Sequence, residues 1–107
     1  MQIHNKLVRD RIPEIIEKSG KMYRSRVLDD EEFITELRKK AFEELQEYMT
    51  TSSNDEAAEE LADILEVIHA LADYHGLTIG AVEQVRKRKY EIRGGFKERV
   101  FLMEIEE

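Results

Sequence analysis

The centre of the chain reads Lys40-Ala41-Phe42-Glu43-Glu44-Leu45-Gln46-Glu47 and, after twelve intervening residues, Glu60-Leu61-Ala62-Asp63. In each segment two acidic residues stand three positions apart, Glu44 with Glu47 and Glu60 with Asp63. Residues with this spacing share one face of an α-helix. Two such helices lying side by side would direct four carboxylates toward one point. Carboxylate oxygens are the ligands that a hard divalent cation such as Mg²⁺ prefers.

Start and stop signals place both acidic segments on helices. Asp29 followed by Glu32 is a variant of the capping box and predicts a helix that runs to about Met49. Ser53 with Glu56 is a second capping box and predicts a helix to His75, with Gly76 as its terminator. The apolar stripe expected on the first of these helices consists of Phe33, Leu37, Ala41, Leu45 and Tyr48, and Glu44 lies beside it.

Shorter elements are expected on either side. An irregular start leads into a short helix that ends at Lys18, with Asp10 as its expected cap. Thr78 caps a fourth helix, which continues to about Ile92 and is broken by Gly94-Gly95. Residues 22–28 alternate in the way typical of a short strand, and the apolar tail 99–105 is either a strand that pairs with them or an arm packed on a neighbouring subunit.

These elements predict an all-α fold for a single domain, residues 1–107. We expect an antiparallel bundle of about four helices with at most a minor β element. The stretch from Ile64 to Ala72 is apolar on more than one face, which is typical of a helix buried on several sides. A chain of 107 residues has few neighbours to offer such a helix. We therefore expect oligomerisation to complete the bundle, as a homodimer or homotetramer.

Composition narrows the class of protein. Charged residues make up 38% of the chain and aromatic residues only 7%, as in water-soluble helical proteins. The absence of cysteine excludes a disulfide framework and thiolate metal sites. A net charge of −7 argues against binding to a nucleic-acid polymer. No apolar region of a signal peptide and no membrane-spanning run is read, so we expect a cytoplasmic protein without a membrane partner.

The acidic residues alone have an ordinary interpretation, because solvated helix faces are rich in glutamate and form i, i+4 ion pairs. Glu60 and Asp63, however, adjoin Leu61, Ile64 and Val67 on the most apolar helix. Burying a carboxylate there without a compensating positive charge costs roughly several kcal/mol of stability. The compensation is either a cation or the basic groups of the chain, which are Lys6, Arg9 and Arg11 near the start and Arg86, Lys87, Arg88, Lys89 and Arg93 further on.

The pattern E-E-x-x-E, gap, E-x-x-D resembles the all-α nucleoside triphosphate pyrophosphohydrolase superfamily, which includes MazG-like proteins and phosphoribosyl-ATP pyrophosphohydrolase. Lys40, three residues before the glutamate pair, also looks like the family's lysine. The segments Asn5-Lys6-Leu7-Val8-Arg9-Asp10 and Arg93-Gly94-Gly95-Phe96 look like the two ends of a small single-domain MazG-like subgroup.

The resemblance implies Mg²⁺-dependent hydrolysis of a nucleotide substrate between its α- and β-phosphates, giving a monophosphate and pyrophosphate; Mn²⁺ is a candidate substitute for Mg²⁺. It implies that Glu44, Glu47, Glu60 and Asp63 are the metal ligands, and that Glu43 is the catalytic residue that orients a ligand or water, or accepts a proton. The candidate substrate-binding residues are Lys40, Lys89, Arg93, Lys6 and Arg9.

Three functions stay open at this point. The leading one is house-cleaning hydrolysis of nucleotides. Phosphoribosyl-ATP hydrolysis uses the same ligand set, so the metal motif does not separate the two enzymes. The third is a non-enzymatic helical oligomerisation or regulatory module with a structural acidic cluster.

Overall fold

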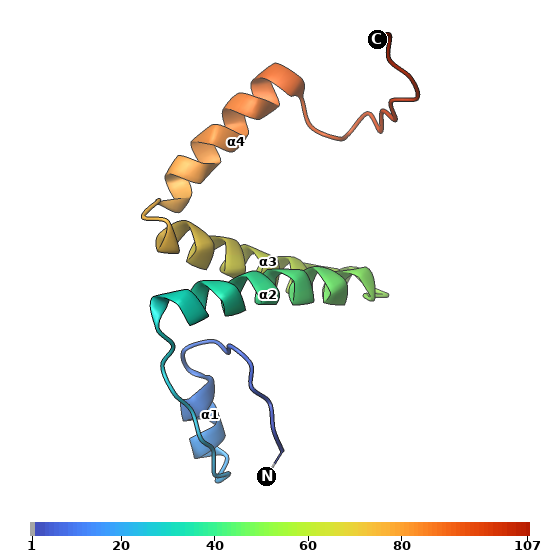
Figure 1. Cartoon of the computed structure of the whole chain (residues 1–107). Coiled ribbons are helices and arrows are strands. Elements are labelled where there is room, and N and C mark those ends of the chain that lie inside the picture. Colours follow the sequence, from blue (N-terminus) through green and yellow to red (C-terminus); the bar gives the residue numbers. More distant parts are fainter. Residues whose placement is uncertain (1) are drawn as a thin grey trace.

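A computed structural model describes residues 2–107 as an all-helical chain (Figure 1). The helices are α1 (Ile12–Lys18), α2 (Asp30–Met49), α3 (Asn54–Tyr74) and α4 (Ile79–Arg93). The predicted all-α class and the number of helices are confirmed. None of these helices is both long enough and apolar enough to cross a membrane.

The possible minor β element is not formed in the described residues, since neither 22–28 nor the tail is a strand. The reason is that each segment lacks a partner. Residues 22–28 connect α1 to α2 at one end of the molecule, whereas the tail follows α4 at the other end (Figure 1). An alternating sequence forms a stable strand only where a second strand takes up its backbone hydrogen bonds.

Local capping explains why the long helices begin where they do. The side chain of Asp29 accepts a hydrogen bond from the Glu32 amide at 2.9 Å, and that of Ser53 accepts one from the Glu56 amide at 3.2 Å. Both predicted caps are therefore confirmed. The Glu56 carboxylate accepts from the Ser52 amide at 3.0 Å, one residue earlier than in a standard capping box. Asp10 does not cap α1, because the helix begins one residue later, after Arg11, without a side-chain cap.

Helices α2 and α3 form an antiparallel hairpin that contains the small core of the chain (Figure 1). Ile34 and Leu37 of α2 are buried, together with Val67 and Ala72 of α3. The predicted stripe on α2 is only partly correct: Leu37 is buried, but Leu45 is 48% exposed. Ile34 and Leu45 are eleven residues apart and so lie within about 20° of each other around the helix. Leu45 differs in lying nearer the turn of the hairpin, where the chain covers this face less.

The remaining helices diverge from this hairpin. The molecule measures 60 × 35 × 27 Å and has a radius of gyration of 18.4 Å, against roughly 13 Å for a compact domain of this length. Its accessible surface is 10358 Å², against about 6,200 Å² for a compact monomer of its mass. The single chain therefore leaves much apolar surface in contact with solvent.

Candidate metal centre

The acidic site lies in the seam of the α2–α3 hairpin and continues the line of its core. Glu44 follows Leu37 by seven residues, and Glu60 precedes Val67 by seven, so each glutamate lies on the buried stripe of its own helix. Because the helices are antiparallel, the two positions meet. The seam is thus apolar at one end and acidic toward the turn that joins the helices.

Three carboxylates converge in this part of the seam. One oxygen each from Glu44, Glu47 and Glu60 lies within 4.8 Å of the other two. Glu44 is only 6% exposed, Glu60 is half-buried and Glu47 is exposed. The Oε2 atoms of Glu44 and Glu60 are both buried and accept no hydrogen bond from the described chain while both groups are ionised. When one of the two carboxyl groups is protonated, it can share its proton with the other. Buried carboxylate oxygens without partners are costly, and a divalent cation would compensate two of them at once.

The electrostatics of the cluster agree with this crowding. Burial, then the charges of Glu47 and Asp63, raise the pKa of Glu44, although Lys40 acts in the opposite direction. Burial and the neighbouring carboxylates of Glu47 and Glu44 raise the pKa of Glu60 to about 7. Both carboxyl groups therefore resist ionisation in the protein alone. A bound cation would stabilise their charged forms and so lower both pKa values.

Asp63 lies close enough to act on Glu44 electrostatically, but its own carboxylate is held from another direction. Nη2 of Arg9 lies 2.5 Å from Oδ1 of Asp63. The converging group therefore consists of three of the four predicted ligands, and the fourth, Asp63, faces a guanidinium at the edge of the site.

Glu43 lies on the same side of the hairpin and is bound by two lysines. Nζ of Lys6 lies 2.8 Å from its Oε1, and Nζ of Lys40 lies 3.9 Å from its Oε2. The hydrogen bond from Lys6 and the charges of both lysines lower the pKa of Glu43. A carboxylate with a lowered pKa is a weak proton acceptor. This environment favours an orienting role for Glu43 over that of a general base.

The N-terminal segment therefore reaches both long helices, through Lys6 to α2 and through Arg9 to α3. Lys40, from α2 itself, also lies 3.7 Å from Oε1 of Glu44. A cleft of about 270 Å³ opens beside Glu43, and its lining includes Lys6, Lys39 and Lys40. Sequence reasoning missed Lys39. Its position next to Lys40 was the available signal, but its ion pair with Glu36 looks like an ordinary surface contact.

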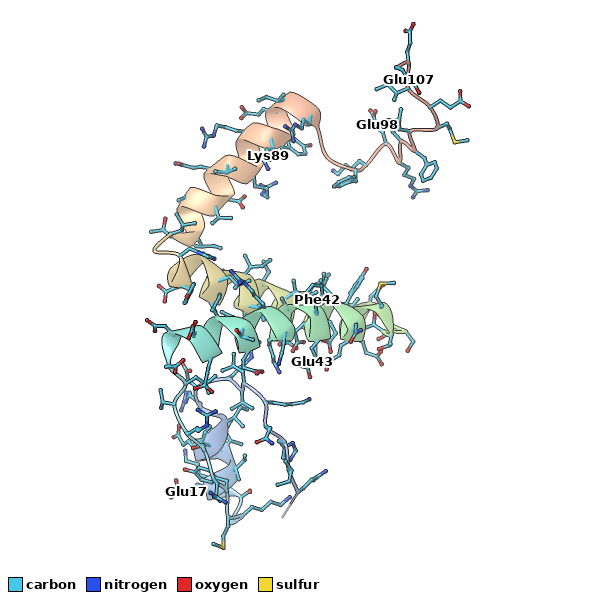
Figure 2. All side chains as sticks on the ribbon, viewed as in Figure 1. Glu17, Phe42, Glu43, Lys89, Glu98 and Glu107 are labelled. Carbon is cyan, nitrogen blue, oxygen red and sulfur yellow. The ribbon has the colours of Figure 1, made fainter. Side chains whose placement is uncertain are left out.

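The structure does not bring Lys89 or Arg93 to this site. Both belong to α4, and Figure 2 shows Lys89 on the far side of the α2–α3 hairpin from Glu43. Of the five predicted substrate-binding residues, the single chain thus places Lys6, Arg9 and Lys40 beside the acidic cluster.

Comparisons of the chain with known protein families, with curated proteins and with solved structures found no match.

Proposed function

We propose that the seam of the α2–α3 hairpin is a divalent-metal site and that the protein is a Mg²⁺-dependent nucleotide pyrophosphohydrolase. The observation that carries the proposal is the pair of buried, unpartnered Oε2 atoms of Glu44 and Glu60 within a converging group of three carboxylates. All of the donors are hard oxygens, as Mg²⁺ requires, and Mn²⁺ would accept the same set. Glu44, Glu47 and Glu60 would hold the ion, and Asp63 would join them or bind a metal-bound water.

The cations around the cluster support a polyphosphate substrate. Lys6, Lys39 and Lys40 line the cleft beside Glu43, and Arg9, which does not line it, pairs with Asp63 of α3. Such side chains would bind phosphate oxygens by charge-assisted hydrogen bonds. A bound Mg²⁺ supplies charge neutralisation and acidifies an attacking water. Glu43 would hold Lys6 and Lys40 in place for the phosphates. Cleavage between the α- and β-phosphates, giving a monophosphate and pyrophosphate, follows from the MazG-like resemblance of the motif.

The proposed enzyme acts as a homo-oligomer. The face of the hairpin opposite Glu43 is apolar and exposed; it consists of Phe42, Leu45, Met49, Leu61, Leu65 and Ile68 and is called here the outer face. Figure 2 shows Phe42 and Glu43 on opposite sides of α2. Exposed apolar patches of this extent are unusual on monomers. A second hairpin packed on the outer face would complete a four-helix bundle.

A structural role for the acidic cluster is the competing function, and the ion pairs Lys6–Glu43 and Arg9–Asp63 favour it. In that case the N-terminal segment is a clamp that joins α2 to α3. Both pairs are largely solvent-exposed, and exposed pairs contribute little to stability, about 0–1 kcal/mol. These pairs also leave the two buried oxygens of the seam without a partner, whereas a bound metal ion would coordinate them.

The direct test is release of pyrophosphate from a mixed nucleotide pool with Mg²⁺ and with a chelator. We expect release only with the metal, and at least about 100-fold less in Glu60→Gln, by comparison with the losses seen when metal sites lose a supporting group. Glu59→Gln is the matched control, because Glu59 is the exposed neighbour on the same helix. A panel of single nucleotides, including phosphoribosyl-ATP, then identifies the substrate. No release from any nucleotide would favour the structural role.

A further inference from the structure

A second groove, which the proposed metal site does not use, runs along α4. Its lining is Leu77, Ala81, Val82, Val85, Arg86 and Lys89, and its volume is about 520 Å³. Most of the lining side chains are apolar, and two are cationic. Arg86 is paired with Glu83 of the same helix, whereas Lys89 forms no ion pair within the described residues. α4 as a whole carries five arginine and lysine residues against two glutamates. The groove therefore suits a segment that is apolar and acidic.

The end of the chain has that composition. The segment 96–107, called here the C-terminal arm, contains Val100, Phe101, Leu102, Met103 and Ile105, and each of these side chains is at least 71% exposed. After Arg99 the arm carries three glutamates and no basic residue. The exposed apolar side chains of the arm favour burial against another surface. Its glutamates favour a surface that carries positive charge.

Two glycines fix the way the chain leaves the end of α4. Gly94 has a φ of +78°, which favours glycine, and its amide donates to the Tyr90 carbonyl at 2.7 Å. Gly95 lies so close to the Tyr90 ring that a Cβ there would be 3.0 Å from a ring carbon. The arm consequently leaves α4 in a defined direction and runs outward from the helix (Figure 1).

We propose that the C-terminal arm of one copy of this chain docks in the α4 groove of a second copy. Val100–Ile105 would lie on Leu77, Val82 and Val85, with Glu104 beside Lys89; a further glutamate of the arm would have to compete with Glu83 for Arg86. The lengths agree, because Leu77 to Lys89 spans roughly 18 Å of helix and six extended residues span about 20 Å. This contact is separate from the outer face of the hairpin and would link copies of the chain through α4.

Because the chain has no cysteine, single cysteines test this contact directly. Val85→Cys places a thiol in the groove and Met103→Cys places one on the arm. On mild oxidation of an equal mixture, we expect the mixed disulfide dimer to exceed random pairing, because docking brings the two positions within disulfide reach. Gln84→Cys replaces Val85→Cys as the matched control, since it is the preceding residue on a different face of α4.

Equal yields from Val85→Cys and Gln84→Cys would overturn the proposal. So would a closed monomer from the doubly substituted chain in excess wild type, because the arm would then fold onto its own groove. A second variant, Phe101→Asp with Met103→Asp, should reduce the assembly measured by light scattering while the helical circular dichroism is unchanged. An unchanged mass of the assembly in this variant would also count against docking of the arm in a second copy. None of these readouts depends on pyrophosphate release, so this proposal and the proposed activity succeed or fail separately.

Discussion

The two faces of the α2–α3 hairpin present opposite problems of burial. On one side Glu43 pairs with Lys6 of the N-terminal segment, and in the adjoining seam the buried oxygens of Glu44 and Glu60 exceed the partners that the chain supplies. The outer face carries Phe42 and Leu65, and its apolar surface exceeds what the chain covers. Phe42 and Glu43 are adjacent in sequence, so a turn of about 100° around the helix separates the two problems. We propose that a cation would solve the first problem and a second copy of the chain the second.

The largest effect is expected from breaking the outer face. Leu65 is 56% exposed, and Leu65→Asp would bury an unpaired charge in the proposed interface. The loss of a central interface contact of about 2 kcal/mol raises the dissociation constant roughly 30-fold. Light scattering across a dilution series should show this shift toward monomer. Val27→Asp is the control, because Val27 is an apolar residue that is 97% exposed and lies outside the hairpin. If Leu65→Asp assembles as the wild type does, the outer face is not an interface.

A smaller effect is expected from the cations of the acidic face. Lys6→Gln or Arg9→Gln should lower kcat/KM for the nucleotide about 10-fold or more, because each removes a charge-assisted contact worth roughly 1.5–3 kcal/mol. Lys18→Gln is the control, since Lys18 pairs with Glu14 on α1. If these side chains bind phosphate oxygens, the lower kcat/KM should come chiefly from a higher KM. Steady-state kinetics with unchanged constants in both variants would remove Lys6 and Arg9 from the substrate site.

The pH dependence of stability sharpens the comparison further. The pKa of Glu60 is about 7 in the folded protein, against a usual value of 4.5. The folded state thus binds the proton more tightly, so the stabilisation is complete below the lower value and is lost as pH rises toward the higher one. The raised pKa of Glu44 acts in the same sense. Without metal, thermal stability should fall as the pH rises from 4.5 to about 7.

With Mg²⁺ the proton is displaced, so metal affinity should rise over the same interval. Glu60→Gln should flatten the metal-free profile and Glu59→Gln should leave it unchanged. Differential scanning fluorimetry across the pH range measures both. A wild-type profile that rises through this interval would contradict the assigned crowding of carboxylates.

The smallest effect is expected from Asp63→Asn. Its ion pair with Arg9 is substantially exposed, so its loss should change the free energy of unfolding by no more than about 1 kcal/mol. Chemical denaturation of the metal-free protein measures this change. A loss of about 3–5 kcal/mol would instead identify the pair as a buried clamp and favour the structural role of the cluster.

The sequence predicted the helices well because their ends depend on neighbouring residues. Asp29, Ser53 and Thr78 each accept a hydrogen bond from an amide three positions along the chain. It predicted less well how far along α2 the apolar stripe is covered, because Leu45 is as apolar as Ile34 and only the packing of the hairpin decides which of them is buried. The proposed ligands on each helix followed from spacing, and three of them converge.

The cations around the site depended on longer-range structure. Lys6 reaches Glu43 across 37 positions and Arg9 reaches Asp63 across 54, through a segment without regular structure. No local pattern specifies such contacts. Lys89 and Arg93 are as positively charged as Lys6 and Arg9, but they lie on α4, which diverges from the site.

Metal-dependent stability of wild type and Glu44→Gln tests the central claim most directly. Glu44 is the most deeply buried carboxylate of the cluster and has an unpartnered oxygen. The amide removes both a metal ligand and the repulsion among neighbouring carboxylates. We predict that Mg²⁺ raises the Tm of the wild type, that Glu44→Gln without metal is at least as stable as the metal-free wild type, and that Mg²⁺ no longer raises its Tm. A wild-type Tm that Mg²⁺ leaves unchanged, or an equal rise in both proteins, would contradict the account.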